Sequence, residues 1–283
     1  MFSILNGVIY YCNRVKQEPL LIIYILLHFI ITFIYKGFNL GIKSITINFL
    51  MLIFWVLIIK LITNDESNNN VFDDKHFKKH LIFTIIFLVY YYFYVKFYFL
   101  VLFVKIKMVV RNNTIFLLIL NALINSLFIT IPFILIALRI GYRFENMRFD
   151  LKHIKISLIL IILTLIIGKI NNFIFPLKLH KLIPMYFIHI LINGLPEELI
   201  FRGFLLESLG KITKSNINAM IFSSLIFQLI HLPIIIAMNG SPIAVFCFYP
   251  SGLVWGYLYI RTRNIIPGVL WHTSNTLLGL IFI

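Results

Sequence analysis

Charged residues and cysteines are scarce in this chain, and each shortage excludes a class of protein. Only 10 of the 283 residues are Asp or Glu, and all charged residues together make up 12%, against about a quarter in a soluble domain. A water-soluble fold of this length needs more charged residues to cover its surface, so we exclude a soluble protein. Cysteine occurs only at Cys12 and Cys247, which excludes a disulfide framework and a cysteine metal site.

Apolar residues are abundant, at 61% of the chain, and the mean hydropathy is +0.98. They run together in blocks, most of them close to the length of about 20 residues that a helix needs to cross a bilayer. The sequence therefore predicts an all-α, polytopic transmembrane helical bundle of eight or nine spans, because the first and fifth blocks are short. The predicted spans are Leu20–Tyr35, Ser44–Ile62, Leu81–Val104, Ile115–Leu138, Ile156–Ile170, Ile183–Leu206, Ile217–Ala237, Ile243–Ile260 and Ile265–Ile283.

The net charge of +15 comes from basic residues that lie almost entirely between the apolar blocks. Basic residues in such places orient a chain in the bilayer and meet anionic headgroups. We therefore expect membrane lipids as partners and no nucleic acid. With nine spans, more Lys and Arg fall on the side of the N-terminus, so we predict a multi-pass protein of the cell membrane with a cytoplasmic N-terminus.

Polar residues inside the apolar blocks divide the chain in two. Residues 1–155 form N-terminal transmembrane helices to which the sequence assigns no role. Residues 156–283 carry almost all the ionisable groups at membrane depth. We predict that this second part holds the functional site.

Two adjacent carboxylates, Glu197 and Glu198, lie in one of these blocks. A charge at bilayer depth is costly, so such residues must face a protein interior or a wet cavity. On a helix Arg202 is four residues after Glu198, the spacing of an ion pair, whereas Glu197 is rotated by about 100° and stays available. Pro196 should kink the helix, and together with Gly194 it should make room for a water molecule beside a carboxylate.

Two histidines in separate spans follow this motif, His231 before Pro233 and His272 in the last span. Either one alone is more often a core or interface residue than a catalyst. Asn275 and Thr276 come one helical turn after His272, so one or both should share its face. Neutral donors there would be suited to holding an oxyanion.

Two chemistries fit one Glu and two His. In the first, Glu197 is the general base on a water that His231 orients, while His272 and Asn275 stabilise the oxyanion. In the second, Glu197, His231 and His272 hold a zinc ion with water in the open position. We favour the metal-free chemistry, because the chain has no His-Glu-x-x-His pair and an Asn suits an oxyanion hole.

The motifs resemble those of the bacterial intramembrane peptidase family of CAAX prenyl proteases and bacteriocin-processing proteins (the CPBP or Abi family). Glu197-Glu198-Leu-Ile-Phe-Arg202 is similar to its Glu-Glu-x-x-x-Arg motif, and Phe227-x-x-x-His231 to its second motif. The stretch 248–267 resembles the span before the final His272. The resemblance covers residues 183 to 283. The family's last motif has Asn or Asp four residues after the His, where this chain has Thr276.

The resemblance implies a peptidase with Glu197, His231 and His272 as catalytic residues, and with Glu198 and Arg202 shaping the site. Its substrate would be a membrane-associated peptide or protein. Two other functions fit the sequence. One is a non-catalytic scaffold or bacteriocin-immunity protein that keeps the motif residues for structure. The other is a transporter with Glu197 as an ion carrier, which the lack of an internal repeat disfavours.

Overall fold

The computed structural model describes residues 19–63, 77–97, 114–139, 141, 149–170, 179–237, 240–243, 245 and 249–278. All regular elements in this part of the chain are helices, so the predicted all-α class is confirmed. Cys12, Cys247 and the predicted span ends Val104 and Ile283 lie outside the described residues.

Before residue 171, the described part of the chain contains six apolar helical segments. They are α2 (Pro19–Lys36), α3 (Phe38–Ile62), α4 (Phe77–Phe97), α6 (Thr114–Asn125), α7 (Ile131–Arg139) and α8 (Ile154–Ile170). A π-helical turn, η3 (Ser126–Thr130), connects α6 to α7 without a break, and a 3₁₀ turn, η5 (Leu151–His153), leads into α8. Asp150 begins that turn by accepting the backbone N–H of Lys152 at 2.8 Å.

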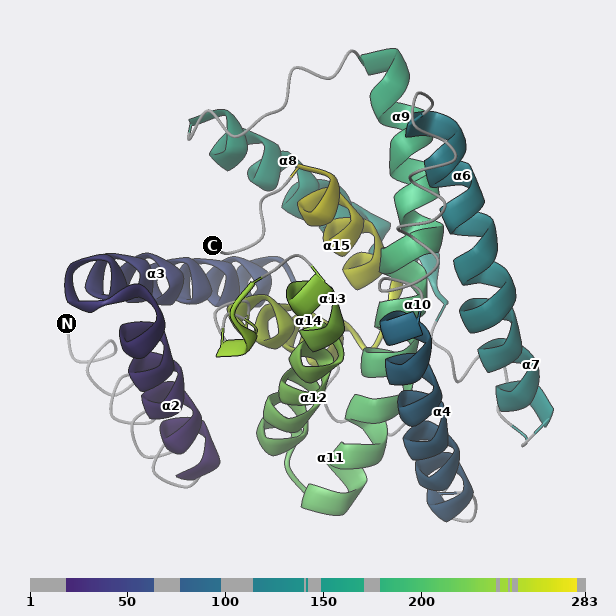
Figure 1. Ribbon diagram of the computed structural model, residues 1–283, viewed down its shortest axis with the longest axis horizontal. Coiled ribbons are helices and arrows are strands. Elements are labelled where there is room, and N and C mark those ends of the chain that lie inside the picture. The colour runs from purple at the N-terminus through teal and green to yellow at the C-terminus, as the bar shows by residue number, and fades with distance from the viewer. Residues whose placement is uncertain are drawn as a thin grey trace.

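Residues 179–213 form an unbroken helix in which α-helical and π-helical segments alternate. Its segments are α9 (Leu179–His189), η6 (Ile190–Gly194), α10 (Leu195–Glu198), η7 (Leu199–Leu206) and α11 (Glu207–Thr213). After it come α12 (Asn216–Ile230), α13 (Leu232–Ala237), α14 (Tyr249–Thr262) and α15 (Ile266–Leu278). Segment α10 lies near the middle of Figure 1, with α15 above it and α4 below it in that view.

Four helices among the described residues are long and apolar enough to cross a membrane: Pro19–Lys36, Ile45–Ile62, Ala122–Arg139 and Asn216–Ile236. This supports a helical membrane protein, but it does not support the predicted count of eight or nine spans. Helices α8, α14 and α15 have only 17, 14 and 13 described residues, below the length of about 20 that a span needs. The α9–α11 helix is long enough but carries four ionisable side chains between residues 197 and 207.

Helix α2 exposes large apolar side chains and buries polar ones, as expected of a helix that lies in lipid. Its buried residues are Tyr24 and Thr32, whereas Leu26, Ile30 and Ile34 are more than half exposed. Since water would penalise such a contiguous apolar surface, this face fits a hydrocarbon environment.

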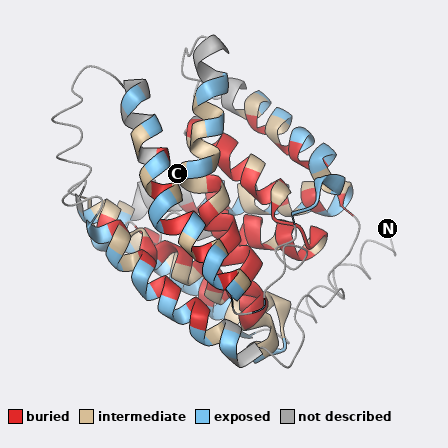
Figure 2. Cartoon of the chain, turned by 90° about the vertical axis from the view of Figure 1, so that its right-hand side faces the viewer, coloured by how far each residue is buried: buried red, intermediate tan, exposed pale blue. Residues whose placement is uncertain are grey.

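One hydrophobic core joins helices from both halves of the chain. It contains Trp55 of α3, Phe87 of α4, Leu160 of α8, Phe204 of η7 and Trp271 of α15. Figure 2 shows the buried residues gathered on the inner helices and the exposed ones on the outer faces. This core includes residues on both sides of the predicted boundary between residues 155 and 156. That boundary stays a prediction.

Glycines let the C-terminal helices approach one another closely. A Cβ at Gly252 would lie 3.1 Å from the Cβ of Ser224, and one at Gly256 would lie 2.8 Å from Met220. Both contacts are with α12, one turn apart, so the Gly252-x-x-x-Gly256 spacing allows these two helices to pack closely. Gly194 was expected to make room for water. Instead, a Cβ there would overlap Thr273 Oγ1 and lie 2.8 Å from the Val269 carbonyl oxygen.

The close approach at Gly194 yields a stability prediction. Gly194→Ala is expected to lower the free energy of unfolding by about 1–3 kcal/mol, because a rigid carbonyl on α15 blocks the new methyl group. Gly210→Ala is the matched control, because its Cβ would meet only ordinary contacts at 3.8 Å and 3.9 Å. That control should leave stability unchanged or raise it. Thermal unfolding in detergent measures both, and equal midpoints would contradict the packing argument.

Candidate active site

The two carboxylates project from α10, a short α-helical segment between two π-helical ones. The N–H of Leu195 bonds to the carbonyl of Ile190, five residues earlier. Pro196, which has no N–H to donate, follows immediately. The switch from α-helical to π-helical hydrogen bonding thus comes just before Pro196, which cannot donate an α-helical hydrogen bond. Single π-helical turns occur often at functional sites, and here two of them bracket Glu197 and Glu198.

Glu198 is fully buried and bridges two partners. Its Oε1 lies 3.3 Å from Arg202 Nη1, which confirms the predicted ion pair, and 2.9 Å from Nδ1 of His272. Its Oε2 rests against α15, since a Cβ on Gly268 would lie 2.7 Å from it. A carboxylate so enclosed needs both donors.

Arg202 is fully buried as well and is held from three sides. In addition to the ion pair, its Nη2 donates to the carbonyl oxygen of Gly252 at 3.4 Å. The guanidinium carbon lies 4.8 Å from the ring centre of Phe227 and 5.4 Å from that of Trp255. These aromatic faces complete a cation–π environment. Arg202 thereby links α14 to the Glu-bearing helix.

His272, from α15, is fixed by both a hydrogen bond and a ring stack. Its Nδ1 faces Glu198, and its ring lies 3.8 Å from the Trp255 ring with an angle of 19° between the planes. The rest of α15 is anchored by Trp271, whose Nε1 donates to Thr164 Oγ1 of α8 at 2.8 Å. These contacts direct Nε2 of His272 toward Glu197.

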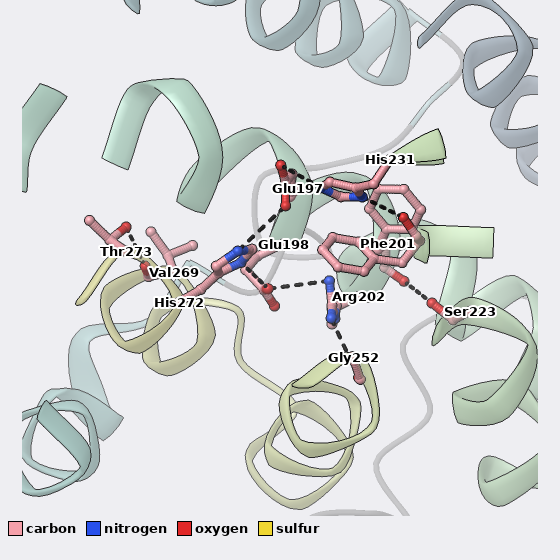
Figure 3. Close-up of polar contacts among 11 residues, drawn as sticks. Glu197, Glu198, Phe201, Arg202, Ser223, His231, Gly252, Val269, His272 and Thr273 are labelled. Carbon is pink, nitrogen blue, oxygen red and sulfur yellow. Dashed lines mark hydrogen bonds and ion pairs between the residues drawn. The ribbon is translucent and has the colours of Figure 1, made fainter. Parts of the chain in front are cut away.

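Glu197 faces both histidines, as Figure 3 shows. Its Oε1 lies 3.8 Å from Nε2 of His231, and its Oε2 lies 3.5 Å from Nε2 of His272. The Glu197 side chain is 9% exposed, whereas the His231 side chain is 30% exposed. The cluster therefore opens to its surroundings along His231.

The protonation of His231 follows from its other ring nitrogen. Nδ1 lies 2.7 Å from the carbonyl oxygen of Phe227, and a carbonyl only accepts, so Nδ1 carries a hydrogen. In neutral His231 the Nε2 atom is then an acceptor that faces another acceptor, the Glu197 carboxylate. Oε2 of Glu197 has no hydrogen-bond donor among the described residues. A donor that fits between these groups, such as a water molecule, would satisfy them.

Asn275 does not join this cluster in the described structure. It is buried in α15, but none of the described polar contacts connects it, or the half-buried Thr276, to Glu197, His231 or His272. The structure brings the other five candidates together. The oxyanion role of Asn275 stays a prediction without a supporting contact.

A metal ion finds no support in the arrangement. Within the described residues, no group of three or more His, Cys, Asp or Glu side chains is placed to hold one. The zinc site at Glu197, His231 and His272 stays a prediction, and we derive no step through a metal.

Sequence reasoning missed the contacts of two residues, Trp255 and Arg263. Trp255 lies in the stretch that resembles the family, but nothing in its spacing indicates a stack on His272. Arg263 was counted among the basic residues between spans, yet it forms a buried ion pair of 2.5 Å with Glu207. These partners are 56 residues apart, so no helical periodicity could reveal the pair.

The comparisons with known proteins concern the part of the chain that holds this cluster. Residues 178–278 match the model of the family described as type II CAAX prenyl endopeptidase, Rce1-like. Residues 178–278 are similar to this family, and we call them the Rce1-like region. The resemblance drawn from the Glu-Glu-x-x-x-Arg and histidine motifs is thereby confirmed, and Glu197, Glu198, Arg202, His231, His272 and Asn275 all lie within the Rce1-like region.

The relatives extend this finding only in part. The uncharacterized protein YyaK of Bacillus subtilis (strain 168) is 32% identical over 87 residues, which are 31% of this chain and 29% of YyaK. The chain thus matches less than a third of that relative's length. No solved structure matches the chain. The helices before residue 178 lie outside the Rce1-like region.

Proposed function

We propose that the protein is an intramembrane peptidase that hydrolyses a peptide bond in a membrane-associated peptide or protein. One observation carries the proposal: the Glu197 carboxylate faces Nε2 of two histidines, and its Oε2 has no hydrogen-bond donor among the described residues. A purely structural carboxylate would be expected to have its partners. The Rce1-like match supports the same reaction and makes peptides that end in a CAAX sequence the first substrates to test.

The reaction begins with a water molecule held between Glu197 and His231. Glu197 accepts one proton of the water as general base, while neutral His231 accepts a hydrogen bond from the other. The water oxygen attacks the carbonyl carbon of the scissile bond. Glu197 then returns the proton to the leaving nitrogen, so protons and electrons balance without a cofactor.

His272 stabilises the negative oxygen that forms during the attack. With a hydrogen on both ring nitrogens, Nδ1 donates to Glu198 and Nε2 donates to the developing oxyanion. Trp255, stacked on the ring at 3.8 Å, holds the imidazole in this orientation.

The experiment compares His231→Ala with His189→Ala in proteoliposomes supplied with a farnesylated CAAX peptide and its unprenylated counterpart. Removing His231 is expected to lower the cleavage rate by about 10²-fold, since the water loses an acceptor. His189 is the control, a half-buried histidine on the same helix as Glu197 with no described contact to the cluster. Mass spectrometry of the products measures the rates. Loss of activity in both variants, or in neither, would contradict the proposed role of His231.

A chelator arm of this experiment addresses the zinc alternative. We expect the parent protein to keep its rate after treatment with EDTA, and metal analysis of the active protein to find no stoichiometric zinc. The scaffold alternative predicts no cleavage of any peptide by the parent protein, together with a cellular phenotype that the histidine substitutions leave intact.

A further inference from the structure

The face of the helix that carries Glu197 continues one turn later to Phe201, where a helix from the other half of the chain meets it. Tyr91 of α4 makes an edge-to-face contact with Phe201, with 6.3 Å between ring centres and 61° between planes. Tyr91 is 6% exposed. Helix α4 also packs against η7, which follows Glu197 and Glu198, and against α12, which precedes His231.

The hydroxyl of Tyr91 differs from those of its neighbours on α4. The hydroxyl of Tyr90 donates to the carbonyl of Phe128 at 2.7 Å, and that of Tyr94 donates to Asn125 Oδ1 at 3.3 Å. Within the described residues Tyr91 has no such acceptor, although it is close enough to Glu197 for the two groups to interact electrostatically. A buried tyrosine hydroxyl ordinarily finds a partner, so this one remains available to a group that enters the site.

The contacts of the site among the described residues include no neutral donor. Glu197 and Nε2 of neutral His231 are acceptors, and Asn275 makes no described contact with the cluster. An oxyanion that develops beside them needs more than the single donor on His272, since such holes commonly combine two or more.

We propose that Tyr91 is a further catalytic residue, whose hydroxyl donates a hydrogen bond to the oxyanion formed at the Glu197 site. The assignment rests on the proposed peptidase function. It gives the N-terminal helices, which lie outside the Rce1-like region, a part in the reaction. The hydroxyl keeps its proton throughout, so no acid–base step is added.

The test measures the peptides released from membranes that contain the full-length parent, Tyr91→Phe, Tyr94→Phe or Glu197→Gln. Tyr91→Phe removes only the hydroxyl and keeps the contact with Phe201, so the rate of release is expected to fall by about 10²-fold, the effect of losing one oxyanion donor. Tyr94→Phe makes the same chemical change one turn away, where the hydroxyl is committed to Asn125, and its rate is expected to equal that of the parent. Thermal unfolding is measured for each variant.

The outcomes separate the two proposals. Release by Glu197→Gln at the parental rate would overturn the peptidase function, and the role of Tyr91 with it. If Glu197→Gln is inactive but Tyr91→Phe keeps the parental rate, only the role of Tyr91 is wrong. Equal losses in Tyr91→Phe and Tyr94→Phe, or a loss that matches a fall in folded protein, would assign the effect to packing and overturn it too.

Discussion

Replacing Glu197 by glutamine is expected to abolish peptide release while leaving the folded protein intact. The amide keeps the volume and polarity of the carboxylate but cannot take a proton from water, so the rate should fall by about 10⁴-fold, the upper range for removing a general base. Folding should not suffer, because Oε2 of Glu197 has no hydrogen-bond donor to lose within the described residues. Quantitative mass spectrometry of peptides released from parent and variant membranes measures the effect.

The adjacent carboxylate provides the contrast. Glu198→Gln also removes a buried charge, but from a group paired with Arg202 and His272, so it is expected to lower stability in addition to activity. A Glu197→Gln protein that still releases the parental peptides, or retains the cellular phenotype, would favour a scaffold that keeps the motif for structure. Peptides that disappear only with Glu197→Gln would identify the substrate.

Truncating Arg202 to alanine is expected to cost about 3–5 kcal/mol of stability, because it leaves Glu198 as an unpaired buried charge. Truncation also leaves an empty space between Phe227 and Trp255, where the guanidinium lies in the parent protein, and this adds to the cost. Since a typical domain is stable by only about 5–15 kcal/mol, much of this variant should fail to accumulate in membranes. The yield of folded protein and its thermal midpoint in detergent measure the loss.

Two comparisons isolate the buried charge. Lys96→Ala removes a cation from an exposed position on α4 and should leave the midpoint unchanged. Arg202→Met combined with Glu198→Gln removes both charges and keeps most of the volume, so it should recover most of the stability that Arg202→Ala loses. An Arg202→Ala protein that accumulates and melts like the parent would show that the ion pair does not hold the helices together.

The extent to which the site was predictable depended on distance along the chain. The pairing of Glu198 with Arg202 follows from helical spacing alone, and the structure confirms it. The convergence of Glu197 with His231 and His272 was expected from three residue types in separate helices, and the structure brings them within 4 Å. The amide at Asn275 was assigned by its spacing from His272, but a residue on the same helix turn can still point away from a shared partner.

Other features could not be predicted, because they arise where helices distant in sequence meet. No local pattern marks Trp255 as the surface on which His272 stacks, or Tyr91 as the residue of α4 that meets Phe201. The close contact of Gly194 with Val269 and Thr273 is another case, since the sequence offers the glycine but not the helix that approaches it. The count of eight or nine spans stays a prediction, because four helices among the described residues are long and apolar enough to cross a membrane.

Composition and periodicity determined that this chain is helical and built for lipid, because a chain with so few charges cannot cover a core in water. They also determined which side chains are too costly to bury without a purpose. Only the tertiary structure decided how those side chains meet: Glu198 is occupied by Arg202 and His272, while Glu197 is left facing two imidazoles. The physical reason is that helical spacing fixes neighbours within one turn, whereas contacts between helices depend on packing across the whole core.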